Sequence, residues 1–373
     1  MSSSRSGSRR WGRDEHCHDD AAAKRPRRRQ KHLFLVMDDW ENGYSIHKLD
    51  VDAFESGAGD HDHPGRLPKP SVLRVEAPVD RSPAIVAAMG SKIFLVTDRY
   101  NDEAPILIYD TETASLAIGP RPTPALLPLG FIFLVPVDQK LYALNPRRAD
   151  LQCSFEVMSR DDGDGFRRPE RWSVESVPAP MPLHKDELVT GYAVHPDGRT
   201  IFVSARNRSP PREVTWFFDT RRSVWTWHGD WLLPFQDQGC YVDELDAWVG
   251  LRRDGFLCSC AVPSRGEGAA RPEWKLGKET LFREDPERHV GQPGALLTYM
   301  GSSRFCLVEC AARQEVVTWV DAVNGEDGCV LHVTVFGLEY DKRGELQMTS
   351  HRHARSYLVS RYNGSFPAQM FWM

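Results

Sequence analysis

Long hydrophobic runs are absent from this sequence of 373 residues. Its longest apolar stretches, such as 130–137, are far shorter than the about 20 residues that a membrane-spanning helix needs. The first thirty residues are polar and contain no apolar segment of the kind that a secretory signal carries. We therefore expect an intracellular, soluble protein with no membrane partner.

Helical periodicity is also scarce. No segment keeps apolar residues at helical spacing long enough to predict a dominant helix. Short β-branched or aromatic runs alternate instead with Gly, Pro, Asp and Asn turns, a pattern typical of strands. The sequence therefore predicts an all-β chain, with strands at 32–37, 44–49, 72–76, 84–88, 92–96, 106–109, 131–135, 140–144, 155–157, 191–195, 200–204, 215–218, 224–228, 247–251, 256–260, 296–300, 305–309, 331–336 and 346–349.

Catalytic motifs are missing. Neither a nucleophile elbow of the Gly-x-Ser-x-Gly type nor a His-Glu-x-x-His pair occurs. The segments Gly57-Ala-Gly59 and Gly266-Glu-Gly268 lack the third glycine of a phosphate-binding loop, and we interpret both as flexible loops. His195, in a Val-His-Pro-Asp-Gly segment, is interpreted as a hairpin residue. We expect no catalytic residue, no cofactor and no enzymatic activity.

Metal ligands occur only in pairs. The segments 16–18, 61–63 and 351–353 each hold two histidines with one residue between them, whereas a structural zinc needs four converging ligands. Cys258 and Cys260 should lie on one face of a strand as small buried side chains. The acidic run 161–165 resembles a calcium loop, but Ser173 stands where its last acidic ligand would be. We expect no metal, and the eight cysteines should be free thiols in a reducing compartment.

Charge is distributed unevenly between two predicted domains. Residues 1–31 have a net charge of +6, and residues 32–373 have a net charge of −11. The first segment has almost no apolar residues and should be a disordered basic arm. It carries a candidate nuclear-import cluster, which consists of Lys24, Arg25, Arg27, Arg28 and Arg29. We therefore expect an import receptor as a partner, and we expect the protein in the nucleus, the cytoplasm or both. The alternative is that the arm only promotes solubility.

A repeat runs through residues 32–373. Similar phrases begin near residues 32, 90, 137, 191, 246 and 297, so that the period is about 50 residues with short strands in each unit. Two units end with the segments 108–111 and 217–220. The aspartate in each segment should cap a hairpin turn. The apolar side chain six residues after each aspartate (Leu116, Trp225) should pack between sheets. The period predicts a kelch-like β-propeller of six blades, with room for a seventh at 50–85 or 310–330. The alternative is a pair of β-sandwiches.

Several segments are similar in sequence to the members of one family. They are Lys31–Asp50, Tyr192–Val203, Trp227–Phe235, Glu244–Leu251, Trp274–Phe282 and Phe336–Glu345. These segments resemble a plant family, expanded in grasses, of uncharacterised kelch-like proteins (domain-of-unknown-function family 1668). The resemblance extends from residue 31 to the C-terminal Phe-Trp-Met. It implies a propeller-like fold and a plant source, and it supplies no activity and no site residues.

The function predicted from these features is that of a monomeric interaction scaffold, whose propeller loops bind a protein partner. Eleven tryptophans favour binding modestly, although Trp216, Trp225, Trp227 and Trp248 should serve mainly in packing between sheets. The alternatives are an enzyme that uses the central channel and a nucleic-acid-associated factor that acts through the basic arm. No sequence-specific nucleic acid is expected, because no recognition helix or aromatic interleaving supports it.

Overall fold

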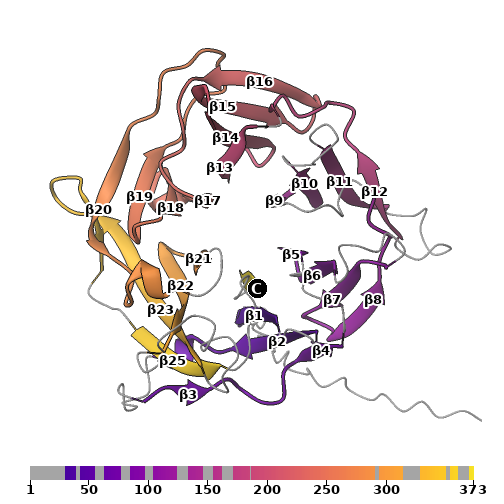
Figure 1. Ribbon diagram of the computed structural model, residues 1–373, viewed down its shortest axis with the longest axis vertical. Coiled ribbons are helices and arrows are strands. Elements are labelled where there is room, and N and C mark those ends of the chain that lie inside the picture. The colour runs from indigo at the N-terminus through magenta and orange to yellow at the C-terminus, as the bar shows by residue number, and fades with distance from the viewer. Residues whose placement is uncertain are drawn as a thin grey trace, which may run out of the picture. The chain divides into compact units, whose positions relative to one another are not determined.

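The computed structural model describes most of the chain after the basic arm. The described residues are 30–38, 43–54, 63–76, 85–96, 104–123, 133–145, 154–161, 171–184, 186–289, 294–313, 328–349, 353–359 and 369–373. Within the chain, His32–Met373 form one compact unit (Figure 1). Its described secondary structure consists of strands and three short 3-10 helices, η2 (Asp52–Phe54), η4 (Asp243–Leu245) and η5 (Pro286–Arg288).

The described strands group into sheets made of antiparallel runs, in which the first strand of each run is the innermost. The first two are β26 (Gln369–Trp372), β1 (Leu33–Asp38), β2 (Tyr44–Leu49), β4 (Leu73–Val75), and β5 (Ile85–Met89), β6 (Lys92–Val96), β7 (Leu107–Asp110), β8 (Ser115–Ile118). The next is β9 (Phe133–Val137), β10 (Lys140–Asn145), β11 (Ser154–Asp161), β12 (Arg171–Ser176).

The remaining sheets follow the same plan. An eight-stranded sheet consists of two four-stranded runs, namely β13 (Leu188–Val194), β14 (Thr200–Arg208), β15 (Pro211–Asp219), β16 (Val224–Gly229), and β17 (Asp237–Val242), β18 (Ala247–Leu251), β19 (Phe256–Ala261), β20 (Trp274–Thr280). β13 and β17 pair in parallel and join these two runs into one sheet. The last sheet is β21 (Ala295–Gly301), β22 (Arg304–Ala312), β23 (Cys329–Tyr340), β25 (His353–Val359), with β3 (Gly65–Arg66) at its outer edge and β24 (Leu346–Met348) beside β23.

Hydrophobic cores between neighbouring sheets arrange these runs around a ring. Tyr142 of β10 meets Phe218 of β15 with ring centroids 6.0 Å apart, and similar cores lie between the other neighbours. Leu35 of β1 and Val333 of β23 share one core, so the last sheet also packs against the first. Figure 1 shows the sheets following one another radially, with β5, β9, β13, β17 and β21 innermost. This is a β-propeller arrangement, and two separate sandwiches do not fit it.

Two strand pairings join the ends of the ring. β26 pairs with β1, from Leu33 opposite Trp372 to Val36 opposite Gln369, so the C-terminal strand is the innermost strand of the N-terminal sheet. β3 pairs in parallel with β25, which ties the connection after β2 to the last sheet. Arg304 strengthens this second junction by an ion pair of 2.9 Å with Asp52. The sequence predicted neither β3 nor β26.

The predicted hairpin aspartates adopt their expected roles. Asp110 Oδ1 accepts the backbone N–H of Glu112 at 2.9 Å, and Asp219 Oδ1 accepts that of Arg221 at 2.9 Å. The apolar residues six positions later differ. Trp225 packs against Phe155 and Phe218, as predicted, whereas the Leu116 side chain is 49% exposed, so its predicted packing is wrong. Leu116 lies on β8, the outermost of the described strands of its sheet.

The stretches 50–85 and 310–330, in which the sequence left room for a seventh repeat, contribute strands to existing sheets where they are described. Between 50 and 85, β3 and β4 join the sheets of β25 and β2, and residues 314–327 lie outside the described part of the chain. The described residues contain no helix long and apolar enough to cross a membrane.

Candidate functional site

The candidate residues of the basic arm lie outside the described residues. These are the import cluster Lys24, Arg25, Arg27, Arg28 and Arg29. The same holds for the His16–His18 pair, the glycines at 57 and 59, and most of the acidic run after Asp161. The import cluster therefore stays a prediction.

The paired cysteines are buried as expected. Cys258 and Cys260 both face the core between β14 and β18 and are fully inaccessible to solvent. Burial raises the pKa of each thiol to about 12, so both thiols are protonated at neutral pH. Among the residues that the structure describes, no group of three or more His, Cys, Asp or Glu side chains is placed to hold a metal ion.

The singled-out tryptophans pack between sheets. Trp248 is fully buried, and its indole N–H donates to the carbonyl of Val194 at 2.9 Å. Trp216, Trp225 and Trp227 are half-buried against the core of β10 and β14. The packing interpretation is thus confirmed.

His195 is a hairpin residue, as predicted, and stands beside a charged cluster. Its Nδ1 accepts the backbone N–H of Asp197 at 3.1 Å. Burial alone would raise the pKa of Asp197, but hydrogen bonds from Arg199 and Thr200 outweigh it and hold that pKa below the usual value. Arg265, from the loop after β19, adds an ion pair to Asp197 at 3.0 Å. This cluster ties two neighbouring strand runs together, and its atoms are already engaged in that contact.

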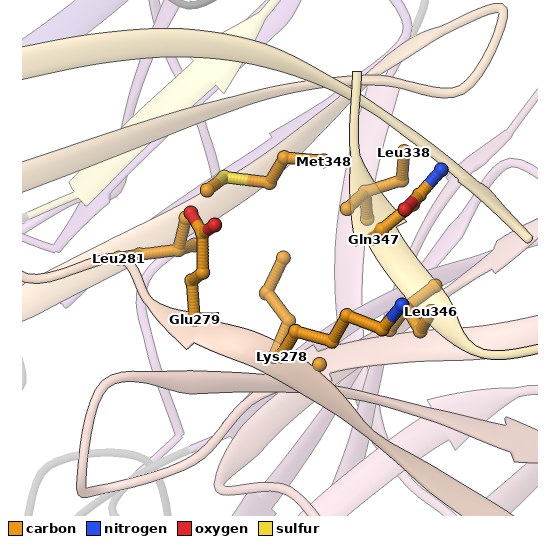
Figure 2. Close-up of a pocket in the computed structure, with 9 residues that line it drawn as sticks. Lys278, Glu279, Leu281, Leu338, Leu346, Gln347 and Met348 are labelled. Atoms are coloured by element: carbon orange, nitrogen blue, oxygen red, sulfur yellow. The ribbon is translucent and has the colours of Figure 1, made fainter. Parts of the chain in front are cut away.

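A small cavity opens at the outer end of the core between β19–β20 and β23–β24. Its volume is about 90 Å³. Its apolar lining consists of Leu257, Leu281, Leu338, Leu346 and Met348. Figure 2 shows Lys278, Glu279 and Gln347 around this lining, with the Glu279 carboxylate turned toward Met348. The cavity thus combines an apolar floor with a polar rim.

Two lysines of β20 hold the hairpin that forms the opposite wall. Lys278 Nζ pairs with Asp341 at 2.7 Å and with Glu345 at 2.9 Å. Lys275 Nζ donates to the carbonyl of Gly344 at 2.6 Å and lies 4.6 Å from the ring centroid of Tyr340. These contacts bridge two neighbouring strand runs beside the cavity.

Asp341 orders the hairpin turn through backbone hydrogen bonds that do not involve the two lysines. Asp341 Oδ1 accepts the backbone N–H groups of Arg343 and Glu345 at 2.8 and 2.9 Å. Gly344 has a φ of 74°, a left-handed conformation that favours glycine. The hydrogen bond from Lys278, together with these backbone donors, lowers the pKa of Asp341 to about 2. The carboxylate is therefore charged at any physiological pH.

The size of the cavity limits what it can hold. Pockets for cofactors or drug-sized ligands typically measure about 300–1,000 Å³, and an apolar cavity of about 150 Å³ accepts a benzene molecule. A volume of about 90 Å³ suits a single aliphatic group. One side chain of a partner protein fits this description better than a nucleotide or a cofactor does.

Polar side chains also gather on the innermost strands β13 and β17. The hydroxyl of Tyr192 donates to Gln238 Oε1 at 3.5 Å, next to Asp237. The Asp237 carboxyl is reached by solvent yet crowded by protein, and this loss of hydration raises its pKa to about 6. Burial likewise raises the pKa of Cys240 to about 11. Asp237 has a φ of 53°, a strained conformation for a residue other than glycine.

The sequence did not predict the cavity, although both of its walls belong to segments that carry the family resemblance. The segments 274–282 and 336–345 were noted only for their family resemblance, and they pack against each other in the fold. The sequence feature that could have indicated the cavity is the pair Lys275 and Lys278 within a strand-like run. Nothing in the sequence alone showed that these lysines meet Asp341.

Comparison with known proteins places the chain in a family. The family model described as a protein of unknown function (DUF1668) matches residues 30–357. The chain belongs to the DUF1668 family. The matched residues of this DUF1668 protein include all those that line the cavity and the polar side chains gathered on β13 and β17. A search of curated proteins finds no match.

Solved structures resemble the DUF1668 protein at low identity. The periplasmic gluconolactonase PpgL of Pseudomonas aeruginosa is 12% identical with a TM-score of 0.44, covering 92% of this chain and 99% of its own. TolB from Acinetobacter baumannii is 10% identical with a TM-score of 0.41, covering 89% of this chain and 67% of its own. YjhT is 10% identical with a TM-score of 0.41, covering 81% of this chain and 100% of its own.

Proposed function

We propose that this DUF1668 protein is a non-enzymatic interaction scaffold, in which the propeller body binds a protein partner. The single observation that carries this proposal is the cavity between β20 and the β23–β24 hairpin. It has an apolar floor, a polar rim and room for one aliphatic side chain. A buried apolar anchor surrounded by polar contacts is the usual plan of a protein-binding hot spot.

The rigidity of the cavity supports the same proposal. Lys278 and Lys275 hold the hairpin wall at fixed points, and the Asp341 turn is ordered by its own backbone contacts. A site that is formed before binding loses little conformational entropy when the partner arrives. An aliphatic side chain of the partner would therefore enter a cavity that already has its bound shape.

A selection of random peptides displayed on phage tests the proposal on the full chain. We expect enriched peptides to share one bulky aliphatic residue. Met348 lies at the end of the cavity, so Met348→Trp should fill it and weaken these peptides at least about tenfold, which corresponds to about 1.4 kcal/mol. Peptides that bind the Met348→Trp protein as tightly as the unmodified chain would contradict the proposal.

The matched control is Leu276→Ala. Leu276 lies on the same strand as Lys278 and is 43% exposed, but it does not line the cavity. Binding should survive this substitution. Equal losses in both variants would indicate a general effect on β20, and the cavity would then not be the anchor.

A second candidate function is that of an enzyme with its site on the innermost strands. The observation in its favour is Asp237, because a carboxyl with a pKa of about 6 can exchange a proton near neutral pH. Tyr192 and Gln238 beside it could position a small polar substrate. The test is a thermal-shift screen of small hydroxylated compounds, in which a stabilising compound must lose its effect on the Asp237→Asn protein.

The finer features of the fold and the arm are part of the same proposal. We propose a monomer of six kelch-type blades, since the segments that recur with a period of about 50 residues coincide with one hairpin in each successive strand run. Light scattering of the purified chain tests the monomer. A dimer at micromolar concentration would refute it.

The import cluster gives the proposed location. Lys24, Arg25, Arg27, Arg28 and Arg29 form a basic run that suits an acidic import receptor. A fluorescent fusion of the full chain should accumulate in nuclei of plant cells as well as in the cytoplasm. Replacing these five residues by alanine should leave it in the cytoplasm, and unchanged nuclear signal would mean that the arm is no import signal.

A further inference from the structure

The outermost strand β8 differs from its counterparts. It consists of Ser115–Ile118, and the order β5-β6-β7-β8 ends with it, so that no described strand pairs with its outer edge. All four residues are exposed. The side chains of Leu116 and Ile118 are 49% and 79% exposed, which makes Ile118 the most exposed large apolar residue among those described.

The backbone of these same two residues also points away from the sheet. Gly119 N–H donates to Ile106 O at 2.7 Å, and Ile106 N–H donates to Pro120 O at 2.9 Å. Because bonded and non-bonded pairs alternate in an antiparallel ladder, the next bonded pair is Ile108 with Ala117. The N–H and C=O groups of Leu116 and Ile118 therefore face outward, beside their exposed side chains.

The other outer strands that the structure describes are protected in ways that β8 is not. Edge strands are normally guarded by charges or by a covering segment. β12 carries Arg171 and Glu175, β20 carries two lysines and a glutamate, and β4 carries Arg74. β25 is covered by β3.

The uncharged strand β16 is protected by a loop. The ring of His228 contacts Ser264 O at 2.8 Å, and the carbonyl of Ala269 lies 3.0 Å from where a Cβ on Gly229 would stand. The loop after β19 thus covers the end of β16. Only β8, of the outer strands described, has neither charge nor cover.

We propose that β8 is a docking edge, at which an extended segment of a partner protein pairs as an additional strand. The outward N–H and C=O groups of Leu116 and Ile118 are spaced to bond a strand, which is how edge strands bind peptides. The partner segment should carry apolar residues at alternate positions. These would pack beside Leu116 and Ile118, on the face that continues the core of Tyr109 and Ile93.

A second copy of the chain is a poorer occupant. Self-pairing through a strand of four residues would bury only the edge and two apolar side chains. Stable interfaces bury on the order of 1,200–2,000 Å² in total, far more than this edge offers. An extended segment that adds one strand binds instead mainly through main-chain hydrogen bonds to the edge. The proposal lies on a different sheet from the cavity, so either can fail without the other.

The test uses random peptides displayed on phage against the full chain, followed by hydrogen exchange of the complex. Selected peptides should show apolar residues at alternate positions and should slow exchange at the amides of Leu116 and Ile118. Binding through side chains alone would leave these amides unprotected, and that result would overturn the proposal. A failure to select any such peptide would overturn it as well.

The decisive variant is Leu116→Pro. Its missing N–H is one that points outward, so the bonds between β7 and β8 remain and the melting temperature should change little. Peptide affinity should fall at least about tenfold, whereas Leu276→Ala, which lies outside β8 and the cavity, should leave it unchanged. If Leu116→Pro does not fold, Ile118→Lys introduces the charge that guards other edges and should have the same effect. Unchanged affinity in the folded variant would refute the proposal, as would a dimer that the variant dissociates.

Discussion

A buried histidine shows how the environment of one residue sets its chemistry. His332 is 8% exposed, and its Nδ1 meets the hydroxyl of Ser356 at 2.8 Å, while its Nε2 lies 3.8 Å from Glu284. Burial first, then the charges of Arg283 and His289, lower its pKa to about 4, and Glu309 opposes them only in part. The folded protein therefore keeps this ring neutral where an unfolded chain would protonate it.

This difference predicts a pH dependence of stability. The ring is neutral in both states above about pH 6.5, and as the pH falls toward 4 only the unfolded chain binds the proton, so stability is lost over that window. The gap between 6.5 and about 4 corresponds to about 3 kcal/mol. His332→Gln should flatten the melting temperature between pH 6.5 and 4 compared with the unmodified chain. The exposed His63→Gln is the control, and identical slopes in both variants would contradict the argument.

Asp237 predicts the opposite pH dependence. Its pKa is raised to about 6, so the fold favours the protonated carboxyl, and this contribution is present below about pH 4 and lost as the pH rises through 6. Asp237→Asn retains a side chain that tolerates the left-handed backbone and resembles the neutral acid. The variant should melt higher than the unmodified chain at about pH 8 and at the same temperature at about pH 4. A variant that melts lower at both pH values would show that the charge is not the cause.

At the scale of elements, most strands were predictable, including the outer strands β4 and β16, and the strands that were missed lie at the innermost or outermost positions of their runs. Each strand that the sequence predicted lies within a residue or a few of one in the fold, and Tyr44–Leu49, Lys92–Val96 and Ala247–Leu251 have the predicted bounds. The outer strands β8, β12, β20 and β25 were missed, because exposed strands alternate weakly or carry charges. β17 and β26 were missed as well. The cavity could not be predicted for the same reason, since β20 forms one of its walls.

The turns between strands support one prediction at this scale. Asp219 Oδ1 accepts the N–H groups of Arg221 and Arg222 at 2.9 and 3.1 Å, which orders the turn between β15 and β16. Asp219→Ala removes this acceptor and should destabilise the protein by about 1 kcal/mol. Urea unfolding measures the change. Asp219→Asn keeps an oxygen at the same place and should recover most of the stability, and a loss equal to that of alanine would exclude the turn as the cause.

For the whole molecule, stability depends on joining the two ends of the ring. Each core lies between two sheets, so a sheet that loses its neighbour exposes apolar side chains on one face. β26 is held by pairing with β1 and by the bonds between His32 and Met373, of 2.7 and 3.1 Å. Met370 belongs to the core shared with β23, and Phe371 packs on the core toward β6. One short strand therefore contributes to the cores on both sides of the N-terminal sheet.

Removal of residues 369–373 is therefore expected to destabilise the entire ring and not only its first sheet. Without β26, the inner edge of β1 loses its partner, and Leu35 and Val36 become accessible to water. We expect a melting temperature lower by many degrees and rapid proteolysis within both the first and the last sheets. Removal of residues 1–29 is the control and should leave melting unchanged. If the protein without 369–373 melted like the full chain, β3 pairing with β25 would be sufficient to hold the ring closed, and the C-terminal strand would be dispensable.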